Sequence, residues 1–393
     1  SKSVSTRGGK QLTAFEMGVA DYEENRHFFL SQYFRKHYDE GMRTLPNLTT
    51  GVSVNRVEIW VTNKNGTTTN TRNIVALTDL GESDNISNTK WVSSGVSVPS
   101  NGANSEYAAL AGSLNAARNI DQTSIVLNGA GLVGGVDYEK LQSARLLTSS
   151  EYTLNQALGY VSLRGALQTD QVLAVAFEYT YGGRTYQVGE FASDVSDVTQ
   201  ALFVKSLKNT SNNPSQGNWR LMMKNVYYLA SNVEKDQFRL DVKFQSDTAG
   251  VYLSYIPEPL VKSEPLIKVL GADRLDNNNK AHSNGYFDFV EGYTVSDGRV
   301  FFPASEPFGS YLYNYLRSKG VDAAKAERYA FTELYDSTKT VAKQIAEKDK
   351  FLLQGQYRGT SANVISLGAF NVPQGSVVVI AGGVRLTEGA DYS

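Results

Sequence analysis

Several kinds of chemistry are excluded by what this 393-residue chain lacks. It has no cysteine, so it forms no disulfide and offers no thiolate as a nucleophile or zinc ligand. Only three histidines occur, and neither a Gly-x-Ser-x-Gly nor a His-Glu-x-x-His motif is present, so no catalytic set is recognisable. We therefore predict that the protein is not an enzyme, with no catalytic, metal or cofactor-binding residue to name.

The chain also lacks a charge excess and a long apolar run. Lys and Arg number 38 against 40 Asp and Glu, which leaves no surplus of positive charge for binding nucleic acid. No segment approaches ~18 uninterrupted apolar residues, so no helical membrane span is expected. The first residues do not resemble a signal peptide, so a signal for export would lie outside this sequence.

The strongest strand pattern runs from residue 172 to residue 181. Gly182 and Gly183 follow it, and a pair of glycines is typical of a two-residue hairpin turn into residues 184–190. Strict alternation places successive side chains on opposite faces of a strand. One face is expected to carry Leu173, Val175, Phe177, Tyr179 and Tyr181, and the other Ala174, Ala176, Glu178 and Thr180.

A short motif, Gly-x-x-Leu-x-x-Gly-x-Asp-Tyr, occurs at residues 129–138 and again at 383–392. Each copy follows an apolar run, which predicts a strand, a glycine turn and a second strand. A phosphate-binding loop would instead place its glycines before a helix, and that context is missing here. Because strands follow the first copy and the chain stops at Ser393, we expect the second copy to open a truncated module.

The remaining patterns predict a mixture of helices and strands. An aromatic stripe within residues 12–42 indicates a docked helix, with His27 and His37 too far apart along it to share a metal. Residues 81–104 are rich in Ser, Asn and Gly and predict a loop. A strand is expected at residues 51–62, and a second strand at 73–80 is expected to pair with it. Further strands are expected at residues 219–229, 238–244 and 251–256. Helices are expected at residues 106–118, with Ser105 as the N-cap, and at 306–318 and 322–349.

One acidic segment has a composition that suits a hard cation. Asp273, Asp276 and Asp288 lie among several asparagines and could supply carboxylate and amide oxygens to calcium. An EF-hand read from Asp276 fails at its fifth position, Lys280, and lacks glycine at the sixth. The alternative is a structural turn, because asparagine tolerates left-handed backbone conformations.

Several longer segments resemble one protein family. These are ENRHFFLSQYFRKHYD (24–39), RVEIWVTN (56–63), SEYTLNQALGYVSL (150–163), DQVLAVAFEYTYGG (170–183), YQVGEF (186–191), WRLMMKNVYYL (219–229) and GYFDFVEGYTVSDGRVFFPASEPFG (285–309). They are similar to the SprA/Sov family, the outer-membrane translocon of the Bacteroidetes type IX secretion system. The resemblance runs along nearly the whole chain.

This resemblance implies a soluble region of a very large outer-membrane barrel that passes folded cargo to the cell surface and supports gliding motility. The implied partners are other parts of the translocon, a PorV-type shuttle protein, a periplasmic plug and secreted cargo. The implied location is the outer membrane or cell surface, on the extracellular or the periplasmic side. The alternative is a secreted carbohydrate-binding or adhesive β module.

The expected fold is α+β and rich in strands, with several antiparallel sheet or sandwich modules and packed helices. The length suffices for two or three domains. We divide the chain into an α+β segment (1–123), a β module with the glycine motif (124–200), β hairpins followed by helices (201–370), and the start of a truncated β module (371–393). Charged residues alternating with the apolar face at 238–244 favour a sheet that is in contact with water rather than lipid.

Overall fold

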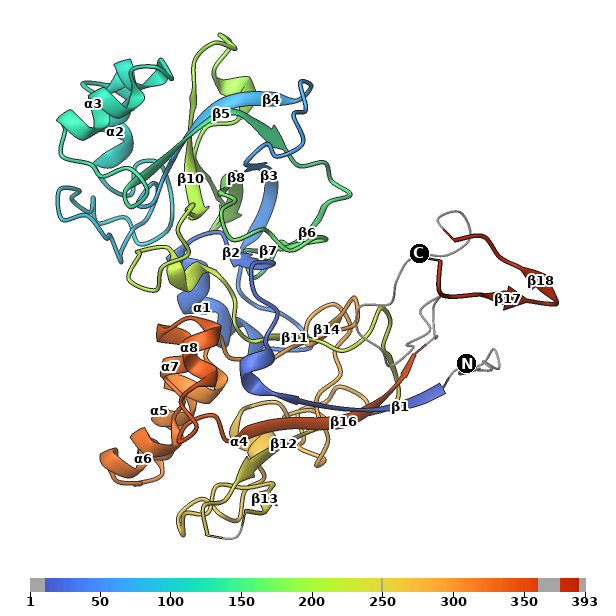
Figure 1. Ribbon diagram of the computed structural model, residues 1–393. Coiled ribbons are helices and arrows are strands. Elements are labelled where there is room, and N and C mark those ends of the chain that lie inside the picture. The colour runs from blue at the N-terminus through green and yellow to red at the C-terminus, as the bar shows by residue number, and fades with distance from the viewer. Residues whose placement is uncertain (1–10, 249, 360–374, 389–393) are drawn as a thin grey trace.

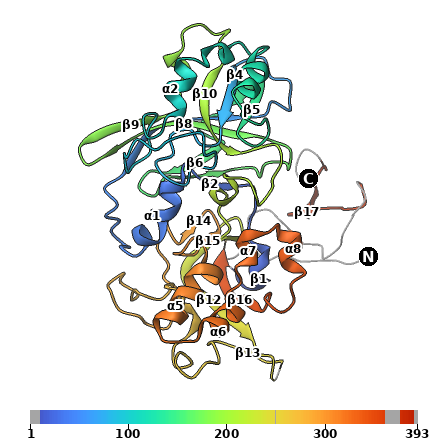
Figure 2. The same cartoon turned by 90° about the vertical axis from the view of Figure 1, so that its left-hand side faces the viewer.

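The computed structural model describes residues 11–248, 250–359 and 375–388. Figure 1 shows two lobes, the upper one built around β3, β4, β5, β8 and β10 and the lower one around β1, β12 and β16. The 90° view in Figure 2 shows the same division, with α1 between the lobes. The predicted α+β fold with several antiparallel sheets and packed helices is confirmed.

The sheet of the upper lobe closes on itself. Its strand order is β10-β4-β5-β3-β8-β9, and β10 also pairs with β8, so five strands form a ring and β9 extends it. All pairs are antiparallel except β10–β4. The strands are β3 (Ser53–Val61), β4 (Thr71–Leu77), β5 (Tyr138–Leu146), β8 (Leu173–Tyr181), β9 (Arg184–Val188) and β10 (Leu202–Lys208).

Alternation along β8 and the Gly182-Gly183 hairpin to β9 are confirmed. Both faces of β8 are buried, however, because one lines the interior of the ring and the other faces α1. A ring of five strands has a narrow interior. The cluster of buried residues there joins Trp60 and four alanines to four larger apolar side chains: Ala76, Ala144, Ala174 and Ala176, and Ile74, Phe191, Leu202 and Val204.

The strand at 73–80 was expected to pair with the strand at 51–62, and this is wrong. β5 lies between β4 and β3, so β4 pairs with β5 and β10 instead. The outer face of β4 is covered by short helices whose Leu110 and Leu127 are fully buried. These helices are α2 (Glu106–Ala111), η2 (Asn115–Arg118) and α3 (Thr123–Gly129); η3 (Ala192–Asp194) follows β9.

The prediction of a strand before Gly129 is also wrong, because residues 123–129 form α3. Leu127 packs into the core under this helix while Ile125 is 68% exposed, an arrangement that one helical turn allows. In the second copy of the motif, Gly382 and Gly383 take positive φ and close a hairpin between β17 (Ile380–Ala381) and β18 (Val384–Arg385). The two copies therefore differ in structure, and Gly389, Asp391 and Tyr392 lie outside the described residues.

The helix expected over residues 12–42 is only partly confirmed. The segment forms β1 (Gln11–Gly18), η1 (Val19–Asp21), β2 (His27–Phe29) and α1 (Gln32–Met42). Phe28 and Phe29 belong to a strand because β2 pairs with β7. Ser31 caps α1, since its Oγ accepts a hydrogen bond from the backbone of Phe34. His27 and His37 thus lie in different elements.

Small sheets join the lobes. One has the order β2-β7-β6, with β6 (Tyr152–Asn155) and β7 (Tyr160–Leu163), and the other β11-β15-β14, with β11 (Val226–Tyr228), β14 (Val295–Ser296) and β15 (Arg299–Phe301). The strand expected at 219–229 is therefore shorter, because η4 (Trp219–Leu221) opens the segment. There Trp219 donates its indole N–H to the Tyr335 carbonyl at 2.7 Å.

The lower lobe packs a four-stranded sheet, β1-β16-β12-β13, against short helices. In β12 the alternating apolar face is confirmed, since Phe238, Leu240, Val242 and Phe244 are all buried. The helix predicted at 322–349 divides into three, because Phe331 leaves the helix and its N–H binds the Phe308 carbonyl at 2.6 Å. The elements are β12 (Glu234–Gln245), β13 (Tyr252–Leu253), α4 (Leu266–Val269), η5 (Pro307–Tyr311), α5 (Leu312–Ser318), α6 (Ala323–Tyr329), α7 (Glu333–Asp336), α8 (Lys339–Lys343) and β16 (Phe351–Gly359).

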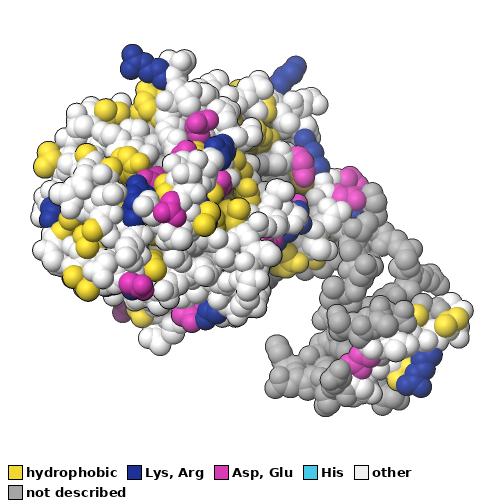
Figure 3. All heavy atoms as spheres, turned by 90° about the horizontal axis from the view of Figure 1, so that it is seen from above, with side chains coloured by type: hydrophobic (Ala, Val, Ile, Leu, Met, Phe, Trp, Pro, Cys, Tyr) yellow, Lys and Arg dark blue, Asp and Glu magenta, His cyan; other side chains and the backbone are white. Residues whose placement is uncertain are grey.

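The sheets do not follow the four segments suggested by the sequence. The closed sheet takes strands from segments 1–123, 124–200 and 201–370, and the lower sheet takes β1 from the first and the rest from the third. The β17–β18 hairpin stands apart from both lobes (Figure 1). On the face seen in Figure 3, acidic and basic side chains are interspersed with hydrophobic ones.

Candidate functional site

The acidic segment that suggested calcium forms a loop held by its own backbone. Asp273 is 2% exposed, and its two carboxylate oxygens accept hydrogen bonds from the amides of Asn284 and Gly285 at 2.9 and 2.8 Å. Asp276 accepts from the amides of Asn278 and Lys280. These carboxylates therefore stabilise the loop.

Asp288 plays the same part on the other side of this loop. Its oxygens accept hydrogen bonds from the amides of Arg274 and Leu275 at 2.7 and 3.0 Å, while burial raises the pKa of Asp288 to about 6. Among the described residues no group of three or more acidic or histidine side chains is arranged to hold a metal ion.

A groove of about 330 Å³ lies on the side of α1. Its lining comes from three places in the chain: α1 and the loop after it, the β6–β7 turn, and the end of β8. We call it the α1 groove. It is lined by Tyr33, Phe34, His37, Glu40, Gly41, Thr44, Thr49, Thr50, Val52, Ala157, Leu158 and Tyr181.

Two glycines let the elements around the α1 groove approach closely. A Cβ at Gly41 would lie 2.7 Å from the Leu158 side chain, so only glycine lets α1 pack against the β6–β7 turn. Gly159 has φ +69°, and a Cβ there would lie 2.4 Å from the ring of Phe34. The floor of the groove therefore depends on both positions.

One rim of the α1 groove is a stacked pair of rings. Tyr33 and His37 lie one helical turn apart, with ring centroids 3.9 Å apart and planes inclined by 26°. The Nδ1 atom of His37 lies 2.8 Å from the Tyr33 carbonyl. A carbonyl only accepts, so Nδ1 carries the proton, and Nε2 of a neutral ring is left as an acceptor.

Tyr181, at the end of β8, is 36% exposed and also lines the groove. Burial, together with the neighbouring Tyr181, raises the pKa of Tyr33 to about 12, so the Tyr33 phenol stays neutral at physiological pH. Glu40 lies on the exposed face of α1 beside Tyr33. Within the described residues its carboxylate has no hydrogen-bond or ion-pair partner.

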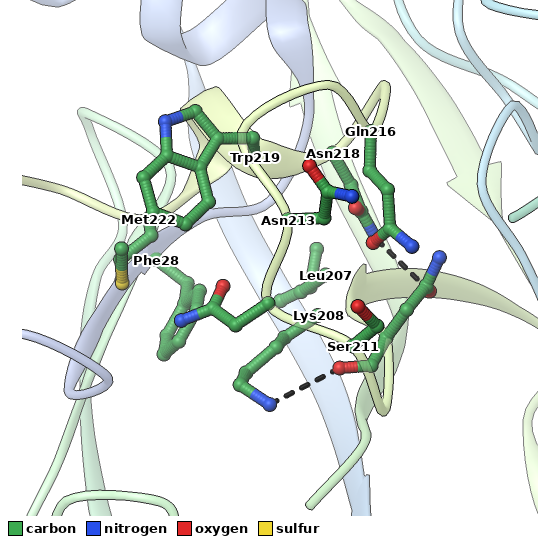
Figure 4. Close-up of a pocket in the computed structure, with 11 residues that line it drawn as sticks. Phe28, Leu207, Lys208, Ser211, Asn213, Gln216, Asn218, Trp219 and Met222 are labelled. Carbon is green, nitrogen blue, oxygen red and sulfur yellow. Dashed lines mark hydrogen bonds between the residues drawn. The ribbon is translucent and has the colours of Figure 1, made fainter. Parts of the chain in front are cut away.

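A second, much smaller cavity lies between β10 and η4 (Figure 4). Phe28, Trp219 and Met222 line one side of it, and Lys208 and Asn218 lie on its polar side. Its volume is about 10 Å³, which is at most the space for one water molecule. This cavity is too small for a substrate.

A serine, a histidine and a glutamate form a row between the lobes. The Nδ1 atom of His27 lies 2.7 Å from Ser162 Oγ, and its Nε2 atom lies 2.7 Å from Glu23 Oε1, which also accepts from Arg299 at 2.8 Å. Ser–His–Glu rows occur in nucleophilic enzymes. Here, however, His27 is 1% exposed, so a substrate cannot reach the ring. The row instead connects β2 to β7 and β15. His27 and Ser162 lie 135 positions apart in the chain, so no sequence motif indicated that they are in contact.

Buried charge is concentrated beneath α2. Lys205 and Glu82 are each 1% exposed, with Nζ and Oε1 3.3 Å apart. Glu106 is also 1% exposed, but neither of its carboxylate oxygens has a hydrogen-bond partner among the described residues. Burial, and then the nearby Asp79, raises the pKa of Glu106 well above its ordinary value.

No protein-family model matches this chain, and no curated protein matches it either. Within the described ranges, no helix has both the length and the apolar character needed to cross a membrane.

Proposed function

We propose that this chain is a non-enzymatic region of an SprA/Sov-like channel that carries folded proteins across the outer membrane in the type IX secretion system. In this role it belongs to the cell-surface or periplasmic part of the channel and contributes to secretion and gliding. Its proposed contacts are other parts of the translocon, a PorV-type shuttle, a periplasmic plug and secreted cargo.

The observation that supports this proposal is the pairing of the family-like segments with one another. Segment 24–39 contains β2, which pairs with β7 of segment 150–163. Segment 56–63 overlaps the second half of β3, which pairs with β8 of segment 170–183. Segment 219–229 contains β11, which pairs with β15 of segment 285–309.

Two of these pairs also contact each other at the junction of the lobes. The amide of Met223 donates to the His27 carbonyl at 2.8 Å, and the hydroxyl of Tyr38 donates to the Phe302 carbonyl at 2.8 Å. Asn225, fully buried, also donates to the Phe302 carbonyl, at 2.9 Å. Matches scattered by chance along a sequence have no reason to assemble in this way, which favours a resemblance that covers one folded body.

The test uses the full-length protein in its own cells. A photo-crosslinking residue is placed at Val92 or Val198, which are 67% and 69% exposed. The proposal expects adducts with a shuttle protein, a plug or exported cargo. Release of the protein into the medium as a free module, without such adducts, would contradict it.

A secreted carbohydrate-binding or adhesive module is the second candidate, because the aromatic rim of the α1 groove offers a surface for binding another molecule. The length of the parent reading frame separates the two. A chain several times longer, with membrane-strand patterns on both sides of this region, supports the channel.

A further inference from the structure

The α1 groove combines aromatic rings with a single unpaired charge. Its lining contains two tyrosines, one histidine and one carboxylate, but no lysine or arginine. From this we infer that the groove binds an arginine side chain presented by a partner polypeptide. The inference does not depend on the proposed function.

The rings supply the first part of such a site. A guanidinium group is planar and stacks on aromatic faces, where the ring quadrupole attracts the cation. The rings of Tyr33 and Tyr181 border the groove from two elements, and the ring of Tyr33 is held by its stack on His37, with ring centroids 3.9 Å apart. A ring pair that is already positioned loses little side-chain freedom when a ligand binds.

Glu40 supplies the second part. A carboxylate accepts two parallel N–H bonds from a guanidinium, and this geometry favours arginine over lysine. The lysine that could neutralise Glu40 from one turn earlier, Lys36, is instead paired with Asp84 at 2.7 Å. The charge of Glu40 is therefore available to a ligand.

The polar groups inside the groove argue against a sugar as the ligand. Sugar recognition needs several side chains with unused donors and acceptors around the ring hydroxyls. The hydroxyl of Thr44 already donates to the Gly41 carbonyl at 2.7 Å, and that of Thr50 donates to the Ala157 carbonyl at 2.8 Å. These internal bonds occupy both hydroxyls, and Glu40 is the one carboxylate in the lining. A volume of about 330 Å³ suits a side chain with part of its backbone.

The absence of cysteine makes a site-specific probe simple. Thr49→Cys on the rim provides the only thiol in the chain, because the native sequence contains none. The side chain of Thr49 is exposed, and its hydrogen bond to Thr44 is made by the backbone amide, so the substitution keeps that bond. A trifluoromethyl label on this thiol reports binding by ¹⁹F NMR.

The labelled full chain is titrated with acetyl-Gly-Arg-Gly-amide and with the citrulline analogue, which has the same shape without the charge. We expect the arginine peptide to bind about tenfold more tightly than the citrulline peptide. Glu40→Gln should weaken the arginine peptide about fivefold, with the loss reduced at high salt. Glu347→Gln, an exposed substitution outside the groove, should change neither.

Circular dichroism confirms that each variant is folded. Equal binding of the two peptides, or no effect of Glu40→Gln in a folded protein, would overturn the inference. So would a label that responds to cellobiose or maltose and not to the arginine peptide, which would identify a sugar site. None of these results bears on the crosslinking test of secretion.

Discussion

Glu106 offers the sharpest test of the structure, because a buried carboxyl group without a partner destabilises a protein in a pH-dependent way. It is the first residue of α2, and its backbone amide is capped by the side-chain oxygen of Asn104 at 2.8 Å. Ser105, which the sequence favoured as the capping residue, instead accepts a hydrogen bond from the amide of Val92 at 2.9 Å. The carboxyl group of Glu106 points into the protein and is 1% exposed.

The sign of the effect follows from the direction of the pKa shift. Burial raises the pKa of Glu106 well above its ordinary value of 4.5 in the folded state. Below pH 4.5 the group is protonated in both states and its ionisation costs nothing. As the pH rises, the unfolded chain ionises first, so the folded state loses stability until the folded pKa is reached.

The magnitude follows from the same numbers. While Glu106 is ionised in the unfolded chain and neutral in the folded protein, each pH unit lowers the free energy of unfolding by about 1.4 kcal/mol. If the folded group is still neutral at pH 7, the 2.5 units from pH 4.5 to pH 7 lower it by roughly 3 kcal/mol. Glutamine has nearly the same shape and does not ionise. Glu106→Gln should therefore raise the free energy of unfolding by up to about 3 kcal/mol at pH 7 and by almost nothing at pH 4.

Urea denaturation of the wild-type and variant proteins from pH 4 to pH 8 measures this difference. The other titrating groups are common to both proteins and cancel. Glu347→Gln, at an exposed position, is the matched control and should show no such trend. The same stability difference at pH 4 and at pH 7, or a destabilised variant at pH 7, would refute the reasoning.

Three further predictions concern other parts of the molecule. Burial alone would raise the pKa of Glu23, but hydrogen bonds from His27 and Arg299 outweigh it and lower this pKa to about 2. The ionised Glu23 therefore stabilises the folded state fully above pH 4.5, and this stabilisation is lost as the pH falls toward 2. Glu23→Gln should accordingly lower the free energy of unfolding by about 2–3 kcal/mol at pH 7 and by much less near pH 2, as urea titrations at both pH values will show. Gly159→Ala should lower the free energy of unfolding by about 2–5 kcal/mol, and Gly183→Ala by roughly 1 kcal/mol. Both glycines have positive φ, but only a Cβ at residue 159 would clash with an aromatic ring, that of Phe34. Similar melting temperatures for the two variants would contradict this. Amide hydrogens of the β17–β18 hairpin should exchange far faster than those of β8, because a two-stranded hairpin with exposed Ile380 and Val384 is marginal in water. Hydrogen exchange followed by mass spectrometry measures this, and equal protection of the two elements would contradict it.

The local sequence was sufficient to predict the elements in which the spacing of apolar residues along the chain fits only one secondary structure. The alternation in β8 and β12 and the glycine pair between β8 and β9 specified strands and a hairpin without reference to the rest of the chain. The helix ending near Gly41 was equally legible. In β12 the pattern reflects a buried side and a more exposed side, and in β8 it separates large from small side chains on two buried faces. The turn between β8 and β9 is one that glycine permits.

Tertiary contacts decided the elements for which the local pattern was compatible with two structures. The apolar residues before Gly129 suit a strand as well as a helix, and burial of Leu127 against the closed sheet selected α3. Phe28 and Phe29 fit an aromatic helix, but pairing with β7 made them a strand. The helix at 322–349 was interrupted because Phe331 enters the core.

The candidate site was beyond sequence reasoning for a different reason. The α1 groove brings together Tyr33, Glu40 and Tyr181, which come from α1 and from the end of β8 nearly 150 residues later. No spacing along the chain encodes that proximity. It arises because Gly41 and Gly159 let α1 and the β6–β7 turn close against each other, and that close approach exists only in the folded protein.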